Sequence, residues 1–270
     1  MLPKLLAIDL DGTVFNSKGI ISKKNKQMLC KLESLGVQIV IATGRGIYSA
    51  TNVMNEIGIK GYIIGLNGAS IFHVEEREPL QVSEIPYSII NKIMAIGSHS
   101  EVNIYLNTVD STHLILRDYQ LYEYFGIKKE FKIIDINEVK IMETENIIIS
   151  KILFSSKNSK LLAKCYQNLS ELNLEVVYPD SLCVEVTLKG INKASGLELL
   201  SQYLGISAQD MVAIGDSEND LSMIKYVGHG MAMGNAMESV KQVADEIIKT
   251  NDEDGIAEAI EELILKSIII

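Results

Sequence analysis

The sequence predicts an α/β protein with a parallel-sheet core domain and an inserted α+β domain. In the first and last parts of the chain, uninterrupted apolar runs of strand length alternate with amphipathic stretches of helical spacing. Strands that are apolar on both faces and are each followed by a helix are typical of a parallel sheet covered on both sides, as in Rossmann-like folds. Between these parts, short polar turns join neighbouring strands, which indicates antiparallel hairpins. We therefore expect residues 1–83 and 189–270 to form the core and residues 84–188 to form the insertion.

The core elements follow from apolar runs and from their stop signals. The first helix ends at Gly36, and Asn67-Gly68 after the third strand is a hairpin signal. The predicted strands are Lys4–Ile8, Val37–Ala42, Tyr62–Leu66, Met211–Ile214 and His229–Met233. The predicted helices are Lys23–Leu35, a second one after Thr43-Gly44-Arg45, Lys193–Leu204, one after Asp220, and two more that begin at Met237 and Gly255.

The insertion combines amphipathic helices with several strands and carries no catalytic signature. Its predicted helices are Tyr87–Gly97 and Ser159–Leu172, and its predicted strands are Val102–Leu106, His113–Leu116, Ile147–Phe154, Leu174–Tyr178 and Leu182–Thr187. Glu185, on the last of these strands, could form a hydrogen bond to a sugar hydroxyl of a substrate. The simpler interpretation is that Glu185 is an ordinary residue of an edge strand without a role in binding.

Composition and charge narrow the class of protein. The chain has 270 residues, of which 47% are hydrophobic and 22% are charged, enough for one large domain or two modest ones. Its net charge of 25 − 35 = −10 argues against a nucleic-acid partner, which selects for a basic surface. The start lacks the pattern of a signal peptide, and no apolar stretch of about 18 residues predicts a membrane span. Three scattered cysteines are typical of a reducing compartment, so we expect a cytoplasmic protein, as a monomer or a weak homodimer.

The most informative residues are two carboxylates at the end of the first strand. Asp9 and Asp11 follow the apolar run Leu5–Ile8 and precede Gly12. Residues two apart in an extended chain point to the same side, so these like charges need compensation. A divalent cation supplies it, and hard oxygen ligands suit Mg²⁺. An isolated Asp-x-Asp is often only a surface turn, so the metal hypothesis depends on the segments that follow.

Three further polar clusters lie at the ends of predicted strands or at the start of a predicted helix of the core domain. Thr43-Gly44 follows the second strand, 216–220 follows a later strand, and Lys193 opens a helix directly after the insertion. In open parallel α/β sheets, functional residues gather beyond the carboxyl ends of the strands. We therefore expect these clusters to meet Asp9 and Asp11 at one edge of the sheet.

Together these motifs resemble the haloacid dehalogenase-like superfamily of phosphatases, and more closely the Cof-type sugar-phosphate phosphatases with a large inserted cap of the C2 type. The resemblance covers the chain outside residues 84–188, which match in position and length only. It implies a Mg²⁺-dependent phosphatase whose insertion closes over the active site. The matching stretches are Asp9-Leu10-Asp11-Gly12-Thr13, Ala42-Thr43-Gly44-Arg45, Asn67-Gly68-Ala69, Gly190-Ile191-Asn192-Lys193, Gly215-Asp216-Ser217-Glu218-Asn219-Asp220, Met233-Gly234-Asn235-Ala236 and Asn251-Asp252-Glu253-Asp254-Gly255.

Phosphoryl transfer gives roles to the first two carboxylates. The reaction needs an in-line nucleophile, neutralised phosphate oxygens and a proton for the leaving group. Asp9 is the candidate nucleophile, because a carboxylate that attacks phosphorus gives an aspartyl-phosphate that water can cleave. Asp11 is the candidate general acid, which requires that it hold a proton at neutral pH. The resemblance also implies that the backbone carbonyl of Asp11 binds the metal.

Other residues are candidates for binding the phosphate group. Thr43 offers a hydroxyl, and the Thr43-Gly44 turn offers N–H groups near a helix N-terminus. Lys193 supplies a compact positive charge for the phosphate and for the neighbouring carboxylate. The resemblance implies that Leu10 and Asn219 also contact the phosphate.

The metal site is expected to use Asp9, Asp11 and Asp216 as ligands. Asp220 is expected to orient ligands or waters from outside that shell. Arg45 has two interpretations that the sequence leaves open, a contact in the site or a structural salt bridge.

We expect a phosphomonoesterase of small phosphorylated metabolites, above all sugar phosphates. A phosphosugar mutase of the same superfamily stays open, because it uses the same aspartyl-phosphate but returns the phosphoryl group to the substrate. A sugar-phosphate sensor without turnover is a third hypothesis, although such a protein is expected to have lost Asp9 or Asp11. A signalling receiver domain also phosphorylates an aspartate, but it is much shorter and lacks the insertion.

Overall fold

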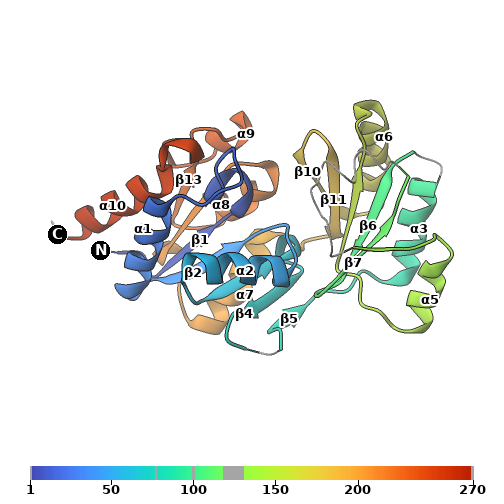
Figure 1. The fold of residues 1–270 in the computed structure, drawn as a ribbon, viewed down its shortest axis with the longest axis horizontal. Helices are drawn as coiled ribbons and strands as arrows, with labels where there is room; N and C mark the ends of the chain where they lie inside the picture. Colours follow the sequence, from blue (N-terminus) through green and yellow to red (C-terminus); the bar gives the residue numbers. More distant parts are fainter. Residues whose placement is uncertain (1, 77, 99–100, 118–130, 269–270) are drawn as a thin grey trace. The chain divides into compact units, whose positions relative to one another are not determined.

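The computed structural model describes residues 2–76, 78–98, 101–117 and 131–268. The chain divides into two compact units, one made of Met1–Gln81 with Asn192–Ile270 and the other of Val82–Ile191 (Figure 1). The first unit contains a largely parallel sheet and the second a mixed one. The predicted fold class, an α/β core interrupted by an α+β insertion, is confirmed.

The first unit is built on an eight-stranded sheet with the order β14-β13-β12-β1-β2-β3-β4-β5. Its strands are β1 (Leu5–Ile8), β2 (Gln38–Ala42), β3 (Tyr62–Gly65), β4 (Ser70–His73), β5 (Gln81–Val82), β12 (Met211–Gly215), β13 (His229–Ala232) and β14 (Glu246–Ile247). Strand β1 pairs in parallel with β12 on one side and β2 on the other, so that Leu5 lies opposite both Met211 and Gln38. Strand β4 turns back antiparallel to β3, as the hairpin signal predicted.

Helices cover this sheet because the central strands are apolar on both faces. All four side chains of β1 are fully buried. Helix α1 packs against α2 and α10, and α7 packs against α8. The helices are α1 (Lys23–Ser34), α2 (Ile47–Ile57), α7 (Lys193–Leu204), α8 (Leu221–Tyr226), α9 (Glu238–Lys241) and α10 (Gly255–Ile268). The helical turns are η1 (Leu10–Val14), η2 (Leu66–Gly68), η3 (Ala208–Asp210), η4 (Glu218–Asp220) and η5 (Asn251–Glu253).

The second unit is a six-stranded sheet with the order β10-β11-β9-β6-β7-β8. Its pairs are antiparallel except β7 with β8, and β6–β7 and β10–β11 are antiparallel hairpins of the kind that the short polar turns predicted. Its strands are β6 (Asn103–Asn107), β7 (Thr112–Ile115), β8 (Phe131–Ile133), β9 (Lys151–Ser155), β10 (Leu174–Asp180) and β11 (Cys183–Leu188). Its helices are α3 (Tyr87–Ser98), α5 (Glu138–Thr144) and α6 (Ser159–Ser170).

Side chains alternate across this second sheet. On β9, Ile152 and Phe154 lie in the apolar cluster that the helices cover, whereas Lys151 points to the opposite face. There the Lys151 ammonium forms a buried ion pair with Glu185 of β11. The role of Glu185 toward a sugar hydroxyl stays a prediction.

Some elements differ from the sequence prediction. The strand expected at Ile147–Phe154 begins only at Lys151, because the Ile147 N–H donates to the Met142 carbonyl and closes the turn after α5. Helix α5 and the short strands β5, β8 and β14 were not predicted. None of the helices in the described ranges combines the length and the apolar character that a bilayer crossing requires.

Candidate active site

Three adjacent parallel strands deliver the predicted site residues to one edge of the sheet. Asp9 follows β1, Asp216 follows β12 and Thr43 follows β2. Because β1 pairs with both of its neighbours in parallel, the carboxyl ends of all three strands meet there. Asp9 is buried, with only 4% of the residue exposed, and its backbone N–H donates to the Ile214 carbonyl at 3.0 Å.

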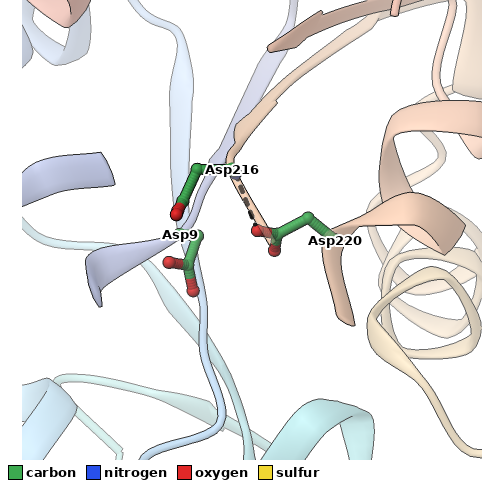
Figure 2. A group of neighbouring side chains, drawn as sticks. All are labelled: Asp9, Asp216 and Asp220. Atoms are coloured by element: carbon green, nitrogen blue, oxygen red, sulfur yellow. Dashed lines mark hydrogen bonds between the residues drawn. The ribbon is translucent and has the colours of Figure 1, made fainter. Parts of the chain in front are cut away.

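Three carboxylates converge at this edge. Single oxygens of Asp9, Asp216 and Asp220 lie within 4.8 Å of one another, and Figure 2 shows the three side chains close together. Such a set of hard oxygen donors fits a divalent cation of the size and charge of Mg²⁺. These residues could therefore hold the metal that the sequence analysis expects.

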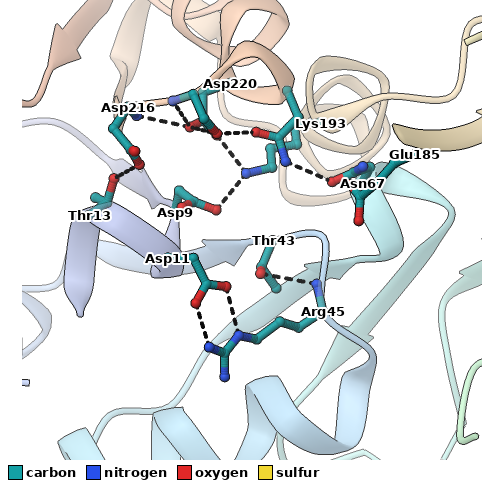
Figure 3. Close-up of polar contacts among 12 residues, drawn as sticks. Asp9, Asp11, Thr13, Thr43, Arg45, Asn67, Glu185, Lys193, Asp216 and Asp220 are labelled. Atoms are coloured by element: carbon teal, nitrogen blue, oxygen red, sulfur yellow. Dashed lines mark hydrogen bonds and ion pairs between the residues drawn. The ribbon is translucent and has the colours of Figure 1, made fainter. Parts of the chain in front are cut away.

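One buried ammonium group joins two of these carboxylates. The Nζ atom of Lys193 lies 2.6 Å from Oδ1 of Asp9 and 2.6 Å from Oδ1 of Asp220 (Figure 3). Lys193 is fully buried at the start of α7, where the Asn192 side chain caps the helix. Burial lowers the pKa of the Lys193 ammonium, but Asp220 and Asp9 outweigh this effect and raise its pKa overall. The lysine therefore stays charged at neutral pH.

Asp220 is held by hydrogen bonds on both of its oxygens. Its Oδ2 atom accepts the N–H groups of Asp216 at 2.9 Å and Ser217 at 3.0 Å, while Oδ1 accepts from Lys193. The carboxylate thus shapes the loop that presents Asp216. Asp220 lies close enough to Asp9 and Asp216 to belong to the group of three carboxylates. Because both of its oxygens are already hydrogen-bonded, these contacts favour the role predicted for it, which is to orient metal ligands from outside the metal shell.

The crowding of negative charge changes the acidity of the other two carboxyl groups. Burial raises the pKa of Asp9 well above its ordinary value, Lys193 opposes this shift, and the other acidic groups add to it. Burial and the Asp220 charge raise the pKa of Asp216 to about 7, although Asp216 accepts a hydrogen bond from the Thr13 hydroxyl at 2.7 Å. Both carboxyl groups therefore favour a bound proton or a bound cation over a bare negative charge.

Gly12 allows Asp216 to approach the loop after β1. The backbone of Gly12 is left-handed, with φ at 81°, and a Cβ atom there would lie 2.3 Å from Oδ2 of Asp216. No side chain fits in that space. Only glycine meets both demands without strain.

Asp11 lies apart from the three converging carboxylates. Its oxygens accept two hydrogen bonds from the Arg45 guanidinium, at 2.8 Å from Nε and 2.5 Å from Nη2 (Figure 3). The Asp11 side chain is 60% exposed, and the guanidinium lies over the Phe15 ring at 4.8 Å. Of the three predicted metal ligands, Asp11 is thus the one whose carboxylate lies outside the group formed by Asp9, Asp216 and Asp220. Metal binding by the backbone carbonyl of Asp11 stays a prediction.

The predicted phosphate-binding residues surround the same edge. Thr43 lies directly after β2 and is buried, and its hydroxyl oxygen accepts the backbone N–H of Arg45 at 3.2 Å. Gly44 follows it in the turn that leads to α2, and Leu10 opens η1 with its side chain in the core. Asn219 lies in η4 beside the carboxylates, where its Oδ1 atom accepts the Ser217 hydroxyl at 2.7 Å.

Two asparagines that the sequence analysis gave no role hold the loop after β1 in place. The Asn235 amide donates to the Gly12 carbonyl at 2.8 Å, and the Asn251 amide donates to the Phe15 carbonyl at 2.8 Å. Asn251 also donates its N–H to Asn235 at 3.0 Å. The signal was present, since both residues lie in motif stretches recognised at 233–236 and 251–255.

Known proteins are similar to this chain over nearly its whole length. The model of the haloacid dehalogenase-like hydrolase family matches residues 6–260. The chain is 30% identical over 266 residues to the 5-amino-6-(5-phospho-D-ribitylamino)uracil phosphatase YcsE of Bacillus subtilis, covering 97% of this chain and 96% of that protein. It is 28% identical over 260 residues to the phosphoglycolate phosphatase of Methanobrevibacter smithii, covering 96% and 98%. The solved structure of a haloacid dehalogenase-like hydrolase from B. subtilis superposes with a TM-score of 0.87 at 26% identity, covering 96% of this chain and 99% of that chain.

The chain belongs to the haloacid dehalogenase-like hydrolase family. Within that family it is a phosphatase, a phosphoric monoester hydrolase of small phosphorylated metabolites. The Cof-type resemblance drawn from the sequence is confirmed.

Replacing Gly12 by alanine is expected to disrupt the site more than the fold. The new Cβ atom collides with Asp216, so metal-dependent phosphatase activity should fall by at least about tenfold, and overpacking should cost about 1–3 kcal/mol of unfolding free energy. Gly19→Ala is the matched control, because Gly19 is also left-handed but has nothing within 4 Å of the place that its Cβ would take. Urea unfolding and phosphate release measure the two effects. Equal losses in both variants would show that backbone strain alone matters at Gly12.

The pKa of about 7 at Asp216 predicts pH-dependent metal binding. Below that pH the Asp216 carboxyl is protonated, so a cation must displace its proton, and the apparent Mg²⁺ affinity should rise by about tenfold per pH unit, or more steeply where the raised pKa of Asp9 leaves a second proton to displace. Calorimetry in buffers of different ionisation enthalpy measures both affinity and proton release.

The control for this titration is Asp210→Asn, which removes an exposed carboxylate paired with Lys4 and should leave the profile unchanged. A Mg²⁺ affinity of the wild type that is constant between about pH 5.5 and 7 would contradict the prediction.

Proposed function

We propose that the protein is a Mg²⁺-dependent phosphomonoesterase for sugar phosphates that works through an aspartyl-phosphate on Asp9. The observation that carries the proposal is the buried Asp9 carboxylate at the edge of a parallel sheet, which is paired with Lys193 and has an oxygen within 4.8 Å of one of Asp216. A surface carboxylate would not need such partners, because water would solvate it.

Binding of substrate is supported by the groups around Asp9. Asp9 and Asp216 would hold the cation, which when bound would supply charge neutralisation for the phosphate oxygens. Lys193 adds a fixed positive charge, and the hydroxyl of Thr43 with the N–H groups of Leu10 and Gly44 would cradle the remaining oxygens. Asp220 keeps Lys193 and the Asp216 loop in position.

The chemistry then takes two steps. In the first, a carboxylate oxygen of Asp9 forms a bond to phosphorus while the bond to the leaving oxygen breaks, and Asp11 gives its proton to that oxygen. In the second, Asp11 takes a proton from water, whose oxygen attacks phosphorus and breaks the bond to Asp9. For this role the Asp11 side chain, which is 60% exposed, would leave Arg45 by a change of rotamer and turn to the leaving group.

Phosphorylated sugars and sugar alcohols are the substrate class that we propose. The name of the B. subtilis relative describes a substrate that carries a phosphorylated ribityl chain, and that relative spans nearly the whole length of this chain. Residues 84–188 form the insertion, which we propose to be a cap that selects the leaving group. Its sheet presents polar side chains such as Lys151 and Glu185 on one face.

Phosphate release tests the proposal directly. A panel of sugar phosphates, phosphorylated sugar alcohols, nucleotides, pyridoxal phosphate and p-nitrophenyl phosphate is incubated with Mg²⁺ or with EDTA. We expect Mg²⁺-dependent release that falls below about one-hundredth in Asp9→Asn, because covalent catalysis is lost. Asp210→Asn serves as a carboxylate control that keeps full activity.

Two outcomes would contradict the proposal. Retention of more than about one-hundredth of the activity in a folded Asp9→Asn variant would exclude Asp9 as nucleophile. No release from any compound by the folded, Mg²⁺-bound wild type would favour a mutase or a sensor.

The acid role of Asp11 predicts a dependence on the leaving group. Asp11→Asn should slow the hydrolysis of sugar phosphates by about 10²–10⁴-fold, whereas p-nitrophenyl phosphate, whose leaving group needs no proton, should lose far less. Mg²⁺ binding, followed as a rise in Tm, should persist because the Asp11 carboxylate lies outside the converging group. Equal losses on both substrates, or loss of Mg²⁺ binding, would rule out this role.

A further inference from the structure

The motif Asn67-Gly68-Ala69 is part of the family resemblance, yet the proposed mechanism gives it no task. In the structure it belongs to the turn η2 between β3 and β4. Three successive residues, Leu66, Asn67 and Gly68, adopt left-handed backbone conformations with φ of 52°, 57° and 98°. Two of these are not glycine, and such conformations persist only where the surroundings enforce them.

The contacts of the turn show what enforces this backbone. The N–H of Asn67 donates to the Thr43 carbonyl at 3.0 Å, and the N–H of Leu66 donates to the Arg45 carbonyl at 3.0 Å. Gly68 lies so close to the N-cap of α7 that a Cβ atom there would be 2.1 Å from the Asn192 carbonyl oxygen. The turn therefore spans the space between Thr43 and the helix start that carries Lys193.

The Asn67 side chain reaches a third element of the site. Asn67 is buried, with 4% of the residue exposed, and its Oδ1 atom accepts the Nδ2 group of Asn219 at 3.1 Å. At the other end of the same amide, Oδ1 of Asn219 accepts the Ser217 hydroxyl at 2.7 Å. In this arrangement the Nδ2 end of the Asn219 amide faces Asn67 and the Oδ1 end faces Ser217, and an amide nitrogen carries two hydrogens.

We propose that Asn67 is a positioning residue that orients the Asn219 amide so that its second N–H is presented to the phosphate of the substrate. The inference rests on the proposed function, because it assumes that a phosphate group binds beside Asp9. Without the Asn67 oxygen, the nitrogen end of the Asn219 amide would lose the contact that fixes its direction, and the Ser217 hydroxyl, which can donate or accept, would not prevent a flip of the amide. The strained backbone of η2 is then the cost of placing that oxygen between the Thr43 turn and Asn219.

The alternative is that asparagine is present only because it tolerates a left-handed backbone better than most residues. Asn67→Gly separates the two explanations, since glycine keeps the backbone conformation and removes only the side chain. The matched control is Asn173→Gly, because Asn173 is an exposed left-handed asparagine in the other compact unit, with φ of 55°.

A double-mutant cycle with Asn219→Ala is the test. The readouts are KM and kcat for a sugar phosphate, the inhibition constant of inorganic phosphate with Mg²⁺ present, and Tm. In the wild-type background, Asn67→Gly should raise KM and the phosphate inhibition constant by about three- to tenfold, the range expected for loss of one oriented hydrogen bond. In the Asn219→Ala background the same change should alter both by less than about twofold. Asn173→Gly should change neither.

Ser217→Ala provides a second route if Asn67→Gly folds poorly. It removes the hydrogen bond at the opposite end of the Asn219 amide and should raise the phosphate inhibition constant in the same way, again only when Asn219 is present. Equal effects of Asn67→Gly in both backgrounds, or wild-type phosphate binding in Asn67→Gly, would overturn the positioning role while leaving the proposed function intact. Absence of Mg²⁺-dependent phosphate release in the wild type would overturn both.

Discussion

The buried ammonium of Lys193 holds the site together electrostatically. Without it, the buried carboxylates of Asp9 and Asp220 would lose the positive charge that balances them, and removing one partner of a buried ion pair costs about 3–5 kcal/mol. One lysine contacts both at 2.6 Å, and it does so from the first turn of α7, whose N-cap is also pressed against Gly68. The position of that helix is therefore coupled to the charge balance of the site.

The parallel sheet explains why residues so distant in sequence can share this charge balance. Strand β1 lies between β12 and β2, so Asp9, Asp216 and Thr43 leave the sheet in the same direction. The neighbouring loops then need little length to close the site. Gly12 and the left-handed turn at Leu66–Gly68 show how tightly they close, because in both places a backbone conformation that few residues adopt brings main chain against main chain or against a carboxylate.

Sequence reasoning reached the fold class, the strands that end at the site and the grouping of Asp9, Asp216 and Lys193 at one edge. These follow from apolar periodicity and from the rule that the carboxyl ends of parallel strands coincide. It could not foresee that Arg45 would take both oxygens of Asp11, because the rotamers of exposed side chains leave no trace in the spacing of residues.

Other features were out of reach for different physical reasons. Strands of two or three residues, such as β14 and β8, are too short to show a period, and their pairing is decided by the neighbouring strand. The hydrogen bonds of Asn235 and Asn251 to the loop after β1 join residues more than 200 positions apart, which no local pattern encodes.

Those long-range hydrogen bonds determine when the site can form during synthesis of the chain. Asp9, the residue proposed as nucleophile, is synthesised before its lysine partner, the Asp216 loop and the two asparagines that hold the Gly12–Phe15 segment, and the whole insertion lies between them in the chain. The site can therefore be completed only after residue 251 has left the ribosome. A nascent chain that stops short of Asn251 lacks the hydrogen bond to the Phe15 carbonyl, so the loop that follows its proposed nucleophile is incompletely held.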